Sequence, residues 1–165
     1  MSQGIPEAAA AVVALAIERG LTVATAESLT AGLVAASLAD TPGASGMLQG
    51  GVVAYQNFVK ADVLGVPQSL LDTVGSVHAG VAEAMAAGAR NACRADVGVA
   101  TTGVAGPEPH DGKPVGTVYV GIATPRGATS FAYTFRGDRA QVRQQSCEAA
   151  LQRLLEALDS LSYRA

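Results

Sequence analysis

Residues 22–60 read TVATAESLTAGLVAASLADTPGASGMLQGGVVAYQNFVK, and this stretch decides the fold. The short β-branched run Thr22–Thr25 predicts a strand, and the polar residues Glu27–Thr30 predict a turn. Apolar residues at helical spacing begin at Ala31-Gly32. Strand, turn and helix together form half of a βαβ unit, and a second strand is predicted over residues 47–55.

The rest of the chain continues this alternation of helices and strands. Upstream, apolar spacing over residues 6–19 predicts a helix that ends at Gly20. Downstream, the patterns predict short helices at 58–64 and 68–72, a long helix over 78–94 entered near Ser76, a buried strand at 96–102, a hairpin of 115–123 and 129–135, and a final helix capped by Asp138. We therefore expect a single domain over residues 1–165, with a three-layer α/β/α fold and a mixed sheet.

Composition excludes several classes of protein. With 49% hydrophobic and 15% charged residues, the 165-residue chain is typical of a compact globular domain. Its net charge of -3, without a basic stripe, argues against nucleic acid as a partner. We predict no signal peptide and no membrane segment, and we interpret Cys93 and Cys147 as free buried thiols of a cytoplasmic protein. Ala-rich helical faces indicate a homo-oligomer, a dimer or larger.

Two polar loops are predicted to follow strands and to face one crevice. Ser28 and Thr30 precede a helix whose first residues include Gly32, so hydroxyls and free N–H groups could bind a phosphate or carboxylate there. The simpler interpretation of the local sequence is that Ser28 or Thr30 only caps the helix. The second loop, Gly103 to Pro107 with Gly106 inside it, strengthens the binding hypothesis, because strand-end loops of α/β sheets tend to share a crevice.

A second group, Ser45, Tyr55 and Lys60, suggests a serine nucleophile with a lysine base. The lysine must lose its proton, so burial or a nearby cation must lower its pKa. A turn serine, an interfacial tyrosine and a solvated lysine explain the same residues, and spacing alone does not bring Ser45 to Lys60. His78 and His110 have no third ligand at metal-binding spacing, so we predict no metal and no cofactor.

The chain resembles the CinA C-terminal domain family over residues 5–158, in one unbroken order of motifs. The matching segments are Ala26–Gly32, Pro42–Ser45, Gly51–Asn57 with Lys60, Leu64–Val66, Thr102–Pro107, Lys113–Val118 and Gly137–Arg139.

This resemblance implies an amidohydrolase that converts nicotinamide mononucleotide to nicotinic acid mononucleotide and ammonia, with a serine and a lysine and without metal. By position, it implies Ser45 as nucleophile, Lys60 as general base and Tyr55 as a supporting residue. It also implies a pocket wall or phosphate contacts, which would comprise Ser28, Thr30, Gly32, Gly103, Gly106 and Arg139. The expected partner is a small nucleotide substrate, and the sequence looks like the stand-alone form of the family.

Several residues depart from the family pattern and bear on specificity. Ala31 stands where a glycine is common, so its methyl group is expected to narrow the nucleotide pocket. Gln56, Phe58 and Val59 replace a small or polar set, and the loop 108–112 is poorer in glycine. This loop belongs to the polar segment 108–114, which is expected to be mobile. A catalytically inactive nucleotide-binding module remains the alternative, whereas a competence or DNA-repair role is not supported by the acidic balance.

Overall fold

The computed structural model describes residues 4–161 as five strands and six α-helices around one sheet. The strands are β1 (Val23–Glu27), β2 (Leu48–Val53), β3 (Val97–Gly103), β4 (Thr117–Thr124) and β5 (Gly127–Thr134). The helices are α1 (Gly4–Arg19), α2 (Leu33–Ala39), α3 (Asn57–Asp62), α4 (Gln68–Val74), α5 (Ala79–Ala92) and α6 (Arg139–Ser160), with a short 3-10 turn η1 (Ala44–Gly46). Every strand and α-helix expected from the sequence is present.

The sheet is mixed, as predicted, with the strand order β2-β1-β3-β4-β5. Strand β1 runs parallel to both β2 and β3, whereas β4 is antiparallel to β3 and to β5. The β1–β2 register shifts between Val23 and Ala24, whose partners are Leu48 and Gly50, so Gln49 is an extra residue in β2. The carboxyl ends of β1, β2 and β3 therefore meet at one edge of the sheet.

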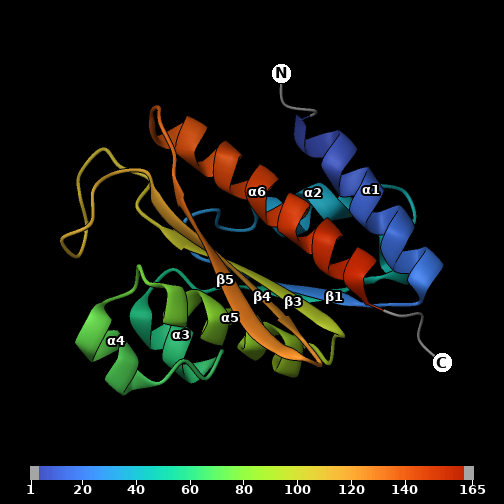
Figure 1. Ribbon diagram of the computed structural model, residues 1–165, viewed down its shortest axis with the longest axis horizontal. Helices are drawn as coiled ribbons and strands as arrows, with labels where there is room; N and C mark the ends of the chain where they lie inside the picture. Colours follow the sequence, from blue (N-terminus) through green and yellow to red (C-terminus); the bar gives the residue numbers. More distant parts are fainter. Residues whose placement is uncertain (1–3, 162–165) are drawn as a thin grey trace.

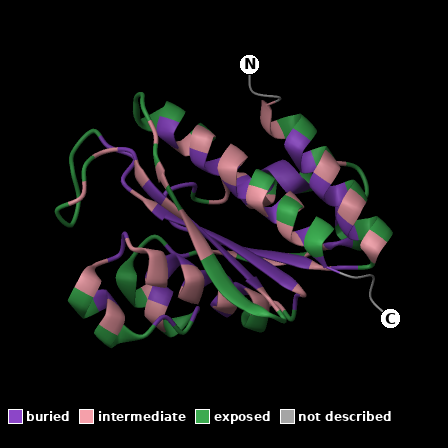
Figure 2. Cartoon of the chain, in the orientation of Figure 1, coloured by how far each residue is buried: buried purple, intermediate pink, exposed green. Residues whose placement is uncertain are grey.

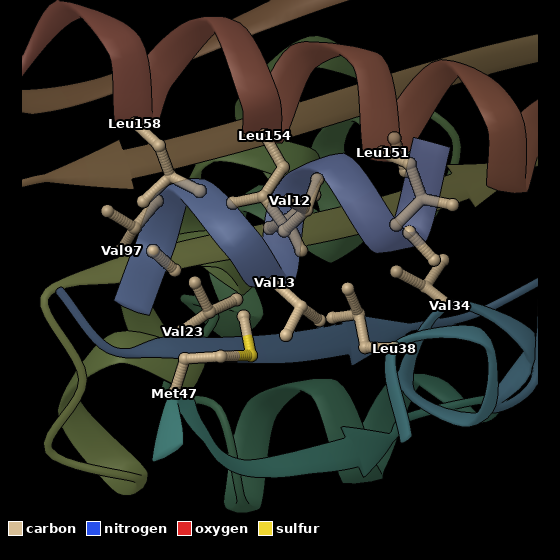
Figure 3. Close-up of a cluster of buried hydrophobic side chains, with 14 of the residues drawn as sticks. Val12, Val13, Val23, Val34, Leu38, Met47, Val97, Leu151, Leu154 and Leu158 are labelled. Carbon is tan, nitrogen blue, oxygen red and sulfur yellow. The ribbon is translucent and has the colours of Figure 1, made fainter. Parts of the chain in front are cut away.

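Helices cover both faces of the sheet, which confirms the three-layer α/β/α fold (Figure 1). Helices α1, α2 and α6 lie on one face, where their apolar side chains meet those of the strands (Figure 3). Leu151, Leu154 and Leu158 of α6 and Val12 of α1 are fully buried there. The outer sides of these helices are exposed, so burial follows the helical repeat (Figure 2).

Helices α3, α4 and α5 cover the opposite face, and α5 packs unusually close to the sheet (Figure 1). A Cβ atom at Gly98 of β3 or Gly121 of β4 would overlap backbone oxygens of α5. The small residues of α5, including the buried Ala82, Ala86 and Ala89, allow this approach. The Ala-rich face of α5 thus packs against the sheet of its own chain.

Three local features refine the predictions. Asp138 caps α6 through a capping box with Gln141, as its position suggested. His78, rather than Ser76, caps α5, because its Nδ1 accepts from the Gly80 N–H at 3.0 Å. The segment 108–114, expected to be mobile, is held in place at Asp111, which accepts a hydrogen bond from the Ser76 N–H. None of the helices within residues 4–161 is both long and apolar enough to cross a bilayer.

Candidate active site

Two residues that follow neighbouring parallel strands meet at the carboxyl edge of the sheet. Ser28 comes directly after β1, and its N–H donates to Thr101 O of β3 at 3.0 Å. Lys60 lies in α3, which follows β2. The Nζ atom of Lys60 is 3.0 Å from the Ser28 Oγ. A serine hydroxyl and a lysine amine are therefore in hydrogen-bond contact, which is the arrangement required for activation of a serine nucleophile by an amine.

The Lys60 side chain is buried, with 1% of the residue exposed. Its Nζ contacts two backbone carbonyls besides Ser28, those of Ala54 at 2.8 Å and Tyr55 at 3.1 Å. Burial lowers the pKa of Lys60 to about 8, and the negative charge of Asp111 opposes this shift. A neutral Lys60 has two N–H bonds for the two carbonyls and a lone pair for the Ser28 hydroxyl, so all three contacts suit the amine as a base.

Ser45 does not take part in this contact, so the prediction that Ser45 pairs with Lys60 is wrong. Ser45 is exposed in η1, ahead of the first residue of β2, whereas Lys60 follows the last. Six residues of strand separate the two positions, roughly 20 Å of extended chain. The residue that follows Ser45, Gly46, lies beside Ile17 near the end of α1. Ser45 therefore lies at the opposite edge of the sheet.

The start of α2 is already occupied by a carboxylate of the protein. Glu27, 1% exposed, accepts from the N–H groups of Val34 and Ala35 at 2.8 and 3.1 Å. It also accepts from Thr30 Oγ1 at 2.7 Å. The predicted phosphate site at this helix start is therefore wrong: the helix N–H groups bind Glu27.

The other residues expected at the phosphate site shape the local structure and do not face the pocket. Thr30 is fully buried, and its hydroxyl also contacts Thr101 Oγ1 at 2.7 Å. Gly32 has a φ of 101° as the residue before α2. Ala31 also has a positive φ, 49°, which explains the preference for glycine at this position. Neither Ala31 nor Gly32 lines the pocket described next, so the expected narrowing by the Ala31 methyl group is wrong.

A pocket of about 440 Å³ opens over Ser28. It brings together most of the other site residues expected from the sequence, namely Ser28, Tyr55, Gly103, Gly106 and Arg139. Its remaining lining residues are Leu29, Gln56, Asn57, Ser76, Val104, Ala105, Pro107, Glu108, Pro109 and His110. The pocket is large enough for a small nucleotide fragment. Its walls are the two strand-end loops that were predicted from the sequence to share one crevice.

Hydrogen bonds between polar groups hold the pocket wall in place. Arg139, the first residue of α6, donates through Nη1 to Gly106 O and through Nη2 to the Tyr55 hydroxyl at 2.8 Å. Because Tyr55 accepts this bond, its own O–H remains available to a ligand. The backbone N–H groups of Leu29, Ala105 and Gly106 donate to no acceptor within residues 4–161. The wall therefore offers several donors for negatively charged oxygens.

A second cavity, of about 390 Å³, lies between β5 and α6 and offers different chemistry. Arg153 crosses it, with its Cζ 3.9 Å from the centre of the Phe131 ring and its Nε 2.7 Å from the Tyr133 hydroxyl. The cavity reaches Arg126 in the hairpin turn, at the edge of the sheet away from Ser28. Its lining holds no contact between a nucleophile and a base. Among residues 4–161, no three His, Cys, Asp or Glu side chains are grouped as metal ligands.

Two residues important to the site were not singled out from the sequence. Glu27 had a detectable signal, because an acidic residue at a strand end before a helix start can cap that helix. Asp111 had little signal, since it is one of several polar residues in an irregular loop. Its partner Ser76 is 35 positions away, a separation that sequence spacing cannot bridge.

Comparison with known proteins places the chain in a family. The family model described as CinA C-terminal domain matches residues 6–158. A CinA-like protein of Frankia casuarinae is 46% identical over 140 residues, and one of Anaeromyxobacter dehalogenans is 49% identical over 150. These matches cover 85% and 89% of this chain but only 32% and 36% of the relatives, so the chain spans about a third of their length.

Solved structures agree in fold. The competence/damage inducible protein CihA of Agrobacterium tumefaciens has a TM-score of 0.90 at 36% identity, and the alignment covers 97% of this chain and 100% of that one. The competence damage-inducible protein A of Klebsiella pneumoniae has a TM-score of 0.93 at 30% identity, with the same coverage of both chains. With its motifs, its sheet order and its strand-end pocket, the chain belongs to the CinA C-terminal domain family.

Proposed function

We propose that the protein hydrolyses the carboxamide of nicotinamide mononucleotide to nicotinic acid mononucleotide and ammonia, with Ser28 as the nucleophile and Lys60 as the base. The observation that carries this proposal is the 3.0 Å contact between Lys60 Nζ and Ser28 Oγ beneath the pocket. The substrate class comes from the family resemblance, and the nucleophile comes from the geometry. The proposal thus keeps the expected serine and lysine chemistry and moves the nucleophile from Ser45 to Ser28.

In the first half of the reaction, neutral Lys60 accepts the Ser28 proton while Oγ attacks the carboxamide carbon. The carbonyl π-electrons move onto oxygen, and the free N–H groups of Leu29, Ala105 and Gly106 are the available donors for this oxyanion. As the C–N bond breaks, the nitrogen takes the proton from Lys60 and leaves as ammonia. Ser28 is then joined to the substrate through an ester.

In the second half, a water molecule takes the place of ammonia. Lys60, neutral again, accepts a proton from this water, whose oxygen attacks the ester carbon. The C–O bond to Ser28 breaks, and Lys60 returns its proton to Oγ. The product is the carboxylate, and the Ser28–Lys60 contact is restored. One amide and one water give one carboxylic acid and one ammonia, which ionise in solution.

Arg139 is the best candidate for a contact with the substrate phosphate, now that Glu27 occupies the start of α2. We expect Arg139→Ala to lower kcat/KM for the mononucleotide by roughly ten- to a hundredfold, because a charge-assisted contact is lost. The dephosphorylated riboside should be a poorer substrate of the unmodified protein and should be hardly affected by the change. Steady-state kinetics on both compounds checks this.

A matched control for Arg139→Ala is available in Arg136→Ala. Arg136 is exposed three residues earlier and does not line the pocket, so its loss should leave the preference for the mononucleotide unchanged. Equal kcat/KM for mononucleotide and riboside in the unmodified protein would show that the phosphate is not recognised.

The direct test of the proposed function is ammonia release from nicotinamide mononucleotide by the purified protein. We expect stoichiometric formation of ammonia and nicotinic acid mononucleotide, undiminished by a metal chelator, because Lys60 supplies the base. No turnover, together with tight binding of the mononucleotide, would instead identify a catalytically inactive nucleotide-binding module. A loss restored by zinc or magnesium would overturn the serine and lysine mechanism.

A further inference from the structure

A carboxylate without a partner lines the pocket on the loop that follows β3. The titratable side chains among the lining residues are those of Tyr55, Glu108, His110 and Arg139. Arg139 and Tyr55 are bound to each other, and His110 Nε2 lies 3.4 Å from Asp111 Oδ2. Within residues 4–161, the Glu108 carboxylate has no ion-pair or hydrogen-bond partner. Its negative charge is therefore available to a ligand.

The backbone that carries Glu108 is restricted by two prolines. Pro107 precedes Glu108, and Pro109 follows it. A proline fixes its own φ, and the residue before a proline is confined mainly to extended conformations. Just upstream, Arg139 donates to Gly106 O, which ties the start of this segment to α6. The position of Glu108 on the pocket wall is therefore defined by the chain itself.

A tight hairpin fixes the other end of the same segment. His110 and Lys113 exchange two backbone hydrogen bonds, with N–O distances of 3.1 and 2.8 Å. Asp111, in the turn between them, accepts from the Ser76 N–H at 3.0 Å. The Lys113 Nζ donates to Val77 O at 2.7 Å. Residues 107–109 are thus anchored on both sides, and Glu108 belongs to a fixed wall of the pocket.

The spacing between Arg139 and Glu108 suits a mononucleotide. Gly106, which binds Arg139, and Glu108 are two residues apart, at most roughly 7 Å of extended chain. In a mononucleotide, one ribose separates the phosphate from the ring, which is a span of the same order. With the phosphate at Arg139, the ring nitrogen of nicotinamide mononucleotide comes within reach of Glu108. This nitrogen carries the positive charge of the pyridinium ring.

We propose that Glu108 is a specificity-determining residue that selects a cationic pyridinium ring: its carboxylate attracts the ring of nicotinamide mononucleotide and gives no such advantage to a mononucleotide whose ring is neutral. The inference deepens the proposed function and rests on it for the identity of the ligand. Because the ring stays cationic while the carboxamide reacts, Glu108 contributes to binding rather than to the chemical step. Glu108 lies on the loop that departs from the family pattern, so we expect this preference to be a property of this chain.

The test compares two ligands of nearly the same shape. One is nicotinamide mononucleotide, and the other is the phosphorylated benzamide C-riboside, in which a carbon atom replaces the ring nitrogen and the ring is neutral. Both carry the phosphate, the ribose and the carboxamide, so a change in the ratio of their dissociation constants reports on the ring charge. Calorimetric titration of the Ser28→Ala protein measures both constants without turnover.

In this background, Glu108→Gln should lower the preference for the cationic ligand by roughly three- to fivefold, since an exposed carboxylate attracts a nearby cation only modestly. Glu108→Lys reverses the charge and should lower the preference by about tenfold or more. Both effects should shrink when salt is added, because the charges are screened. In protein that retains Ser28, Glu108→Gln should raise KM for nicotinamide mononucleotide and leave kcat unchanged.

Glu7→Gln is the matched control. Glu7 is exposed in α1 and does not line the pocket, so the same loss of charge there should leave the ratio unchanged. Glu108 is itself exposed and has no partner within the described residues, so its replacement removes no packing contact. The thermal unfolding of the Glu108 variants should therefore match that of the unmodified protein.

The outcomes separate the inference from the proposed function. An unchanged ratio in Glu108→Gln and Glu108→Lys would overturn the inference, and so would an equal loss for both ligands, which is the result expected if Glu108 binds the ribose hydroxyls. A ratio that falls as described, in a protein that releases no ammonia, would support the role of Glu108 and reject the proposed function. Failure of both mononucleotides to bind would reject both.

Discussion

Replacement of Ser28 by alanine is expected to abolish amide hydrolysis, by at least about a thousandfold in kcat, whereas Ser45→Ala should change it less than about twofold. The reason is geometric, because Ser28 Oγ is the hydroxyl 3.0 Å from Lys60 Nζ and Ser45 is exposed at the other edge of the sheet. Ammonia release from nicotinamide mononucleotide by the two purified variants measures the difference. Ser45→Ala serves as the matched control, since it removes the same atom.

Ser28 and Lys60 should also lose activity together rather than independently. If Ser28 and Lys60 act as a unit, the double variant Ser28→Ala with Lys60→Ala should be hardly slower than either single variant. Multiplicative losses would argue that the two side chains act separately. Full activity of Ser28→Ala, with loss in Ser45→Ala, would restore Ser45 as the nucleophile despite its distance from Lys60. Thermal unfolding of each variant distinguishes loss of chemistry from loss of fold.

Lys60→Met and Lys60→Arg should both lose nearly all turnover, roughly a thousandfold or more, because neither side chain can accept a proton in this range. In the unmodified protein, kcat/KM should rise with pH along an acid limb with a midpoint near 8, since burial lowers the pKa of Lys60 to about 8. Arginine keeps the charge and methionine keeps an apolar stem, so the pair of variants separates proton acceptance from charge. Substantial activity of Lys60→Arg would show that a cation, rather than a base, is needed.

The same buried amine should leave a signature in stability. The folded pKa of about 8 lies below the ordinary 10.5, so between these values the unfolded state binds more protons, and the free energy of unfolding rises with pH. Below about pH 8 the full cost of burying the amine remains. Relative to Lys60→Met, the unmodified protein should gain ~2 kcal/mol between pH 7.5 and 9.5. Urea denaturation at the two pH values measures this gain, and a constant difference would mean that Lys60 titrates normally.

The fold could be predicted from the sequence because its signals are local. The helix over 6–19 ends at a glycine, the run 96–102 is apolar throughout, and Asp138 stands where a helix cap is needed. Each of these patterns lies within one element, so each element was found with errors of only a few residues at its ends. The order of elements then favoured a mixed sheet covered on both faces.

The site was harder to predict, because its contacts depend on which strand ends share an edge. Lys60 follows β2, and Ser28 follows β1, so parallel pairing of these strands brings them together. The same pairing sends Ser45, which precedes β2, to the far edge. The family resemblance assigned Ser45 by position, and sequence spacing did not test that choice, since Ser45 is 15 residues from Lys60 and Ser28 is 32 residues away. Strand direction, once applied, reverses this preference.

The Glu27 carboxylate at the start of α2 limits where new specificity can arise. Because Val34, Ala35 and Thr30 all bind this buried side chain, the turn carrying Ser28 is fastened to the protein interior and cannot be reshaped without loss of that anchor. The facing wall carries no comparable buried charge, and its outer part, residues 108–110, departs from the family pattern. Libraries aimed at other carboxamides should therefore vary residues 108–110 and leave 27–35 constant.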